Sequence, residues 1–216
     1  MIELINISKI FARERGIENI SLKVKKGEWV AIVGSAGAGK STLLRHIYAA
    51  EKPDEGEIIV GDYRFSSLRR NKVPQLRRML GIVDQDLSLM FDRSVFRNIA
   101  VVGEVLGWSK KRTRTKALRV LNQVGLYAHL EVLPATLSYG ERRRLAIARA
   151  LVADPFVLIA DEPLGHLDSD NAKSIVNLLG RIHARGTTLL IATHRLELFE
   201  GQPVRVVRLE SGRLVP

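Results

Sequence analysis

Residues 34 to 42 of the chain read Gly34-Ser35-Ala36-Gly37-Ala38-Gly39-Lys40-Ser41-Thr42. They fit the pattern of a glycine, four residues, a second glycine, a lysine and then serine or threonine, which is typical of phosphate-binding loops. Glycines lack a Cβ, so the backbone can curl and point successive N–H groups at an anion. In such a loop the lysine reaches the β- and γ-phosphates, and the hydroxyl after it can coordinate Mg²⁺.

The flanking sequence supports this interpretation. Trp29 to Val33 is an apolar run of strand length just before the loop, and Ser41 to Tyr48 has a helical pattern just after it. A helix in that place directs the positive end of its dipole at the same phosphates. The sequence therefore predicts a nucleotide-binding site, the alternative being a chance glycine-rich turn.

The composition bounds the class of protein. With 216 residues, 46% of them hydrophobic, the chain can form one sizeable core, or one core and a smaller lobe. It has no cysteine, which excludes disulfides and cysteine metal sites. No apolar run approaches the roughly 20 residues that span a bilayer, and the N-terminus has no signal-peptide pattern. We expect a soluble protein, or one held at a membrane by a partner.

The charge is strongly positive. The net charge of +11 comes from 34 Lys and Arg against 23 Asp and Glu. Two interpretations stay open: attraction to nucleic acid or an anionic membrane face, and a solvated basic surface. Aromatic residues make up 6% of the chain and do not interleave with the basic clusters, which argues against a stacking platform for single strands.

The order of patterns predicts a parallel α/β core with two additions. Residues 2–33 look like strands, with Lys25 to Glu28 as a hairpin-like turn, so the first third reads as a β-rich lobe. Helical patterns fill Asp92 to Asp154, with Ser109 and Ser138 as candidate N-caps. We expect one domain over 1–216, with a helical lobe at about 86–154 inserted in the core.

Polar residues follow three of the predicted buried strands. These residues are Gln85, the pair Asp161-Glu162, and His194. The carboxyl ends of strands in an α/β sheet lie together at the ligand-binding edge. Nucleotide hydrolysis needs a carboxylate for Mg²⁺, a group that orients the attacking water, and groups that stabilise the γ-phosphate charge. The three strand ends can supply these groups.

The ordered set of motifs resembles the ATP-binding subunit of ABC-type ATPases over essentially the whole chain. The motifs are Gly34–Thr42, Gln85, Leu137-Ser138-Tyr139-Gly140-Glu141, Phe156–Glu162, Leu167-Asp168 and His194. The resemblance implies a P-loop NTPase of the ABC ATPase type, with a RecA-like parallel-sheet core, an antiparallel β lobe and an inserted helical lobe. It implies ATP and Mg²⁺ as cofactors.

The resemblance also implies roles for single residues. Lys40 would bind the β- and γ-phosphates, Ser41 and Gln85 would contact Mg²⁺, and Asp161 would hold the ion through water. Glu162 would be the general base and His194 would contact the γ-phosphate.

Other residues would act between two copies of the chain. Ser138 and Gly140 would close over the γ-phosphate bound by a second subunit, in a head-to-tail homodimer with Asp168 at the interface. Phe11 is the candidate for stacking on adenine, and a core position is the alternative.

The signature loop departs from the family pattern. The family usually has LSGGQ or LSGGE, whereas this chain has Tyr139 in place of the first of the two glycines. The phenol could slow turnover or stack on the bound nucleotide. A module that binds ATP without efficient hydrolysis stays open for this reason.

Two further stretches, Asn71–Gly81 and Asp92–Ala100, resemble the FtsE group of bacterial cell-division ATP-binding proteins. That resemblance implies a peripheral protein at the cytoplasmic face of the inner membrane. Its partner would be an FtsX-like integral membrane protein, and no nucleic acid is expected. Leu87 to Phe91 lies where the family receives a helix of the membrane partner, the alternative being core. ATPases of lipoprotein-release and macrolide-export transporters are an alternative, and a nucleic-acid-associated ATPase is another.

Overall fold

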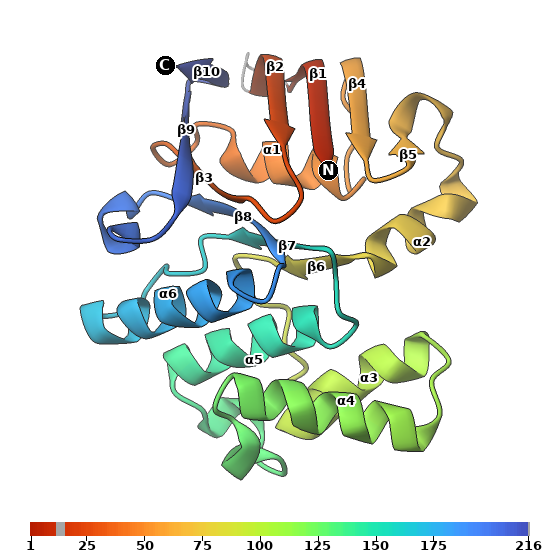
Figure 1. Ribbon diagram of the computed structural model, residues 1–216, viewed down its shortest axis with the longest axis vertical. Helices are drawn as coiled ribbons and strands as arrows, with labels where there is room; N and C mark the ends of the chain where they lie inside the picture. Colours follow the sequence, from red (N-terminus) through yellow and green to blue (C-terminus); the bar gives the residue numbers. More distant parts are fainter. Residues whose placement is uncertain (12–15, 216) are drawn as a thin grey trace.

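The fold combines two β-sheets and a set of helices. A computed structural model describes residues 1–11 and 16–215 (Figure 1). The strands are β1 (Ile2–Ile10), β2 (Gly16–Val24), β3 (Trp29–Val33), β4 (Glu55–Val60), β5 (Tyr63–Arg64), β6 (Leu80–Val83), β7 (Val157–Asp161), β8 (Thr188–Thr193), β9 (Val204–Glu210) and β10 (Arg213–Val215). The helices are α1 (Lys40–Ile47), α2 (Val73–Arg78), α3 (Val95–Val105), α4 (Lys110–Gln123), α5 (Tyr139–Leu151) and α6 (Ser169–His183).

A six-stranded sheet forms the centre of the molecule. Its order is β10-β9-β3-β8-β7-β6, and the pairs from β9 to β6 are all parallel. Both faces are covered, so successive side chains enter different cores. On β7, Val157 and Ile159 pack with α1 and the antiparallel sheet, whereas Leu158 and Ala160 pack with α5 and α6 (Figure 1). Burial on both faces explains why these strands read as continuous apolar runs.

The second sheet is antiparallel, with the order β2-β1-β4-β5. The prediction of an antiparallel β lobe is confirmed, but its boundary was wrong. Strand β3 pairs with β8 and β9 in the parallel sheet, so the turn at Lys25–Glu28 passes from one sheet to the other and closes no hairpin. The physical reason is the run Trp29–Val33 itself, in which Trp29 to Ile32 are nearly inaccessible and need cover on both faces.

Helices α3, α4 and α5 follow β6 and precede β7, and they gather below the central sheet in Figure 1. Each begins at a serine, as predicted for Ser109 and Ser138. The hydroxyls of Ser94, Ser109 and Ser138 accept a hydrogen bond from the backbone N–H three residues on. At Ser138 the Glu141 carboxylate also accepts from the Ser138 N–H, which completes a capping box.

The turn that leads into α3 is held by a buried amide. Asn98 is 0% exposed, and its Oδ1 accepts from Met90 N at 2.9 Å. Its Nδ2 donates to the carbonyls of Met90, Arg93 and Ser94 at 2.9 to 3.1 Å. One side chain thereby fixes the segment between Met90 and α3. Across residues 1–11 and 16–215, no helix has the length and apolar character needed to cross a bilayer.

Candidate nucleotide-binding site

The loop from β3 to α1 has the tight backbone that its glycines permit. Gly39 has φ of +102°, and a Cβ at this position would lie 2.8 Å from Ile17 Cγ2. A Cβ on Gly34 would lie 2.2 Å from the carbonyl oxygen of Leu209. Both positions therefore require glycine. The loop brings Lys40 to a nearly buried place, 6% exposed, where its Nζ donates to the carbonyls of Gly34 and Ser35 at 2.8 and 3.1 Å.

The carboxyl ends of β7 and β8 deliver the predicted polar residues beside this loop. Glu162 Oε1 lies 3.4 Å from Lys40 Nζ, and Glu162 Oε2 lies 2.9 Å from His194 Nδ1. Glu162 has φ of +46°, a backbone conformation that non-glycine residues rarely adopt and that is common at functional sites. Its N–H donates to the Ala192 carbonyl at 2.9 Å, which fixes the strained residue against β8.

These groups line one hollow of about 350 Å³. Its walls are Ala36, Gly37, Lys40, Ser41, Gln85, Arg143, Glu162, Gly165, His166 and His194. The structure thus brings together the phosphate loop, Gln85, Glu162 and His194, as the sequence predicted. Sequence reasoning assigned no role to Arg143 or His166. The three consecutive arginines 142–144 gave no sign of which one turns inward.

Asp161 is suited to a cation. Its Oδ1 is buried without a hydrogen-bond partner among the described residues. Burial raises the pKa of Asp161, and a hydrogen bond with Ser41 partly opposes this effect. The orphaned oxygen beside the Ser41 hydroxyl fits the oxygen ligands that Mg²⁺ prefers. In the described part of the chain, no three His, Cys, Asp or Glu side chains form a metal cluster, so phosphate oxygens and water would have to complete the coordination.

Phe11 borders a second, smaller hollow beside the phosphate loop. This hollow has about 160 Å³ and is also lined by Gly16, Gly37, Gly39, Lys40, Ser41 and Thr42. The ring is 37% exposed and is therefore not a core residue. Lys9 Nζ lies 5.7 Å from its centroid. A base could stack on the ring while its phosphates follow the loop.

Ser138, Gly140 and Asp168 lie outside both hollows. Ser138 is exposed at the start of α5, and Asp168 caps α6 by accepting from Asn171 N at 2.8 Å. Ser138, Gly140 and Asp168 therefore do not border the phosphate loop of their own subunit. Tyr139, also exposed, lies edge-on to His166, with the ring centroids 6.0 Å apart.

The apolar stretch Leu87–Phe91 divides between core and surface. Leu87 and Leu89 are buried in the core, which agrees with the alternative left open for this stretch, whereas Phe91 is 52% exposed. A more apolar hollow of about 450 Å³ lies between α2, β6, α3 and α5. It is lined by Pro74, Arg77, Arg78, Leu80, Ile82, Val101, Val102, Val105, Leu106, Arg149, Ala150 and Ala153.

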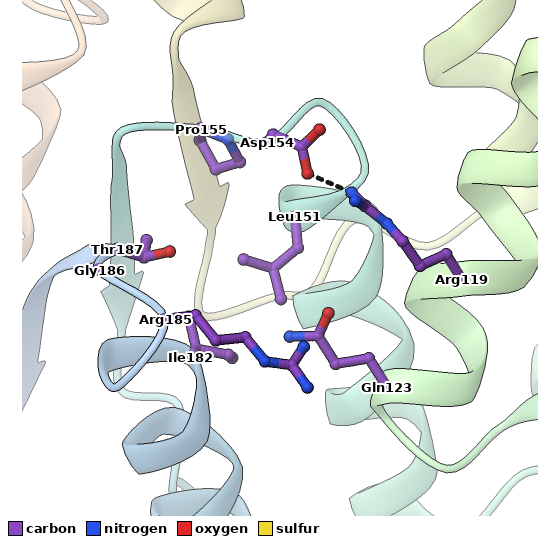
Figure 2. Close-up of a pocket in the computed structure, with 9 residues that line it drawn as sticks. All are labelled: Arg119, Gln123, Leu151, Asp154, Pro155, Ile182, Arg185, Gly186 and Thr187. Atoms are coloured by element: carbon purple, nitrogen blue, oxygen red, sulfur yellow. Dashed lines mark hydrogen bonds and ion pairs between the residues drawn. The ribbon is translucent and has the colours of Figure 1, made fainter.

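Another hollow of about 380 Å³ lies at the amino ends of β7 and β8, whereas Asp161 and His194 lie at their carboxyl ends (Figure 2). Arg119 from α4 reaches Asp154, which also pairs with Lys116, while Arg185 and Gln123 face each other across the opening. Because the phosphate loop and Asp161 lie at the other edge of the sheet, this hollow is separate from the nucleotide site.

The phosphate loop follows the carboxyl end of β3 in a parallel sheet, and Asp161, Glu162 and His194 lie at the same edge. This arrangement defines a P-loop ATPase of the ABC type. A family model described as ABC transporter matches residues 17–165, and the chain belongs to this family. The chain is 43% identical over 199 residues to the cell division ATP-binding protein FtsE of Streptococcus pneumoniae, covering 92% of this chain and 86% of that protein. It is also 41% identical to FtsE of Mycobacterium tuberculosis, covering 100% of this chain and 94% of that protein.

Solved structures agree with the fold. The dimeric structure of MJ0796, a bacterial ABC transporter cassette, has a TM-score of 0.89 and 30% identity, covering 100% of this chain and 97% of that one. A post-hydrolysis dimer of the same cassette, bound to ADP and Pi, has a TM-score of 0.88 and 29% identity, with the same coverage. The protein is therefore an ATP-binding ABC-type ATPase, as the sequence predicted.

Proposed function

We propose that the chain is the ATP-hydrolysing subunit of a membrane-associated complex of the FtsE type. ATP-driven dimerisation would be coupled to an FtsX-like integral membrane partner that regulates cell-wall hydrolysis during division. The observation that carries the catalytic part is the position of Glu162 between Lys40 Nζ and His194 Nδ1. The relatives named FtsE, at 37–43% identity over most of the chain, support the division role.

Each residue of the hollow has a task in this proposal. Lys40 leaves its loop carbonyls to bind the β- and γ-phosphates, while the loop N–H groups cradle the same anions. The Glu162 carboxylate accepts the proton of the attacking water, and His194 hydrogen-bonds Glu162 and the γ-phosphate. Ser41, Gln85 and Asp161 would hold Mg²⁺, which neutralises charge on the β- and γ-oxygens.

The dimer would supply the missing side of the nucleotide. Ser138 and Gly140 lie at the N-terminus of α5, where Ser138 is exposed, Gly140 is buried and the helix dipole favours an anion. They lie outside their own subunit's hollows, so a head-to-tail arrangement would bring them to the γ-phosphate bound by a second copy. Asp168 would lie at that interface.

The membrane partner would dock on the apolar hollow between α2, β6, α3 and α5. Val105 is 71% exposed there, and Arg77, Arg78 and Arg149 surround the apolar floor. A short helix of the partner with apolar and acidic residues fits this combination. Docking would hold the protein at the cytoplasmic face of the inner membrane.

The first experiment tests the catalytic assembly. Without the general base, a Glu162→Gln variant should retain ATP and elute as a dimer in size-exclusion chromatography with ATP and Mg²⁺. Glu200→Gln, an exposed substitution distant from the hollow, should hydrolyse ATP normally and show no such trapping. A Glu162→Gln variant that stays monomeric at saturating ATP would contradict the sandwich mechanism.

The identity of the membrane partner would distinguish the division role from related transport functions. Proteins named methionine import ATP-binding protein MetN are also 36–37% identical over essentially the whole chain, which favours an importer subunit as the second candidate. Glu162→Gln with ATP and Mg²⁺ should be used to capture partners from native membranes. A membrane protein with a large extracytoplasmic domain would support the division role or the lipoprotein-release type, and a permease would support import. Nucleic acid without a membrane protein would overturn the division proposal.

A further inference from the structure

Arg143 is a buried cation without a matching anion. It lies on α5 with 0% exposure, and no described carboxylate lies within 4.0 Å of its guanidinium. Its Nη1 and Nη2 donate long hydrogen bonds to the carbonyls of Gln85 and Gly165, at 3.4 and 3.2 Å, while its Nε has no partner. A guanidinium stays protonated in proteins, and burying a charge without a counter-ion is costly. Burial lowers its pKa, and the nearby Tyr139 and Glu162 oppose this effect.

The two carbonyls belong to loops that carry the proposed chemistry. Gln85 follows β6, and Gly165 is three residues beyond Glu162 in the loop after β7. The Gly165 N–H donates to the Glu162 carbonyl at 3.0 Å, so Arg143 acts on the turn that contains Glu162 itself. The guanidinium also lines the same hollow as Lys40. One side chain of α5 therefore connects two segments that are 80 residues apart, from Gln85 to Gly165.

Tyr139 covers this cation. The Arg143 Cζ lies 5.5 Å from the centre of the Tyr139 ring, within the range of a cation–π interaction. On the other side, Tyr139 contacts the edge of His166, with an interplanar angle of 75°. A cation–π contact is strongest where water is excluded, as it is around Arg143. The bulky residue in the signature loop therefore has partners within its own subunit.

We propose that Arg143 is a positioning residue for hydrolysis, which holds the Gln85 and Glu162 loops against α5, and that Tyr139 stabilises its buried charge. The inference rests on the proposed roles of Gln85 and Glu162. A planar guanidinium can bridge two carbonyls in a fixed geometry, which a glutamine or lysine cannot do. Movement of α5, whose N-terminus carries Ser138, would reach the general base through this bridge.

The test compares Arg143→Gln and Arg143→Lys with Arg144→Gln as a matched control. Arg144 is the next residue of the same helix, bonds Ser174 Oγ at 2.9 Å and lies outside the hollow. Arg143→Gln should lower kcat for ATP on the order of 10- to 100-fold, with KM and the melting temperature little changed, because loop positions shift and the phosphate loop does not. Arg143→Lys should restore less than half of this loss, and Arg144→Gln should behave like the parent. Full recovery of kcat in Arg143→Lys, or an equal loss of kcat in Arg143→Gln and Arg144→Gln, would overturn the proposal that Arg143 bridges the two loops.

A second pair of variants tests the tyrosine. Tyr139→Phe keeps the ring and should lose less of kcat than Tyr139→Gly, which should lower kcat several-fold, as expected for loss of the cation–π contact with Arg143. In an Arg143→Gln background, Tyr139→Gly should have no further effect, since the cation is gone. Additive losses would mean that Tyr139 acts elsewhere, on the nucleotide of the second subunit. A parent protein without ATPase activity would instead defeat the proposed function.

Discussion

The substitution Asn98→Ala should destabilise the protein by about 3 kcal/mol. The Asn98 amide makes contacts with one N–H and three carbonyls, but its two N–H hydrogens can satisfy two acceptors fully, which leaves three complete hydrogen bonds. At about 1 kcal/mol for each bond, their loss gives the estimate. For a chain of this length, such a loss corresponds to a fall in Tm of about 6–12 °C.

Urea unfolding followed by circular dichroism measures this change. The midpoint should fall while the slope m stays the same, because the surface exposed on unfolding does not change. Asn177→Ala is the matched control, since Asn177 is exposed on α6 and alanine favours helix. If Asn98→Ala and Asn177→Ala differ by less than about 1 kcal/mol, the hydrogen-bond reasoning is wrong.

Three further predictions concern Gly39 in the phosphate loop, the pH dependence set by Glu28, and the ion pairs of Asp154. Gly39→Ala should abolish binding of a fluorescent ATP analogue, because a Cβ would lie 2.8 Å from Ile17 Cγ2 at φ of +102°; retained affinity would refute the strain argument. A hydrogen bond from Arg205 lowers the pKa of Glu28 below its usual 4.5, so this carboxylate stabilises the fold above that pH and loses the effect as the pH falls. Glu28→Gln should therefore cost about 1 kcal/mol near neutral pH and progressively less as the pH falls below 4.5, and a difference independent of pH would contradict the pairing. Asp154→Asn, which weakens two partly exposed ion pairs, should cost at most about 1 kcal/mol in the same melts, and a larger loss would show a structural role beyond these pairs.

The meeting of the candidate site residues at one edge of the sheet was predictable, because these residues carry local signals. Gln85, Asp161-Glu162 and His194 each follow an apolar run, and the rule that parallel strands end at one edge places them together. The helix starts at Ser109 and Ser138 are equally local, since capping depends on four consecutive residues.

The misplaced turn at Lys25–Glu28 had a different origin. Two neighbouring strands and a glycine look like a hairpin, but β3 is selected by partners more than 150 residues away. Arg143 escaped notice for a similar reason. Its inward orientation depends on the carbonyls of Gln85 and Gly165, which the sequence of α5 does not contain.

The central place of β3, between β8 and β9, has a consequence for synthesis on the ribosome. The nascent chain exposes its phosphate loop early, but the strands that hold β3 on both sides end at residues 193 and 210. The phosphate loop also contacts the turn between β9 and β10, where the Gly212 N–H donates to the Ala38 carbonyl at 3.1 Å. At ordinary translation rates the loop would wait on the order of ten to thirty seconds for these partners. The phosphate loop therefore gains both neighbours of β3 only after β8 and β9 have been synthesised, and we expect a chain that stops before β8 to bind no ATP.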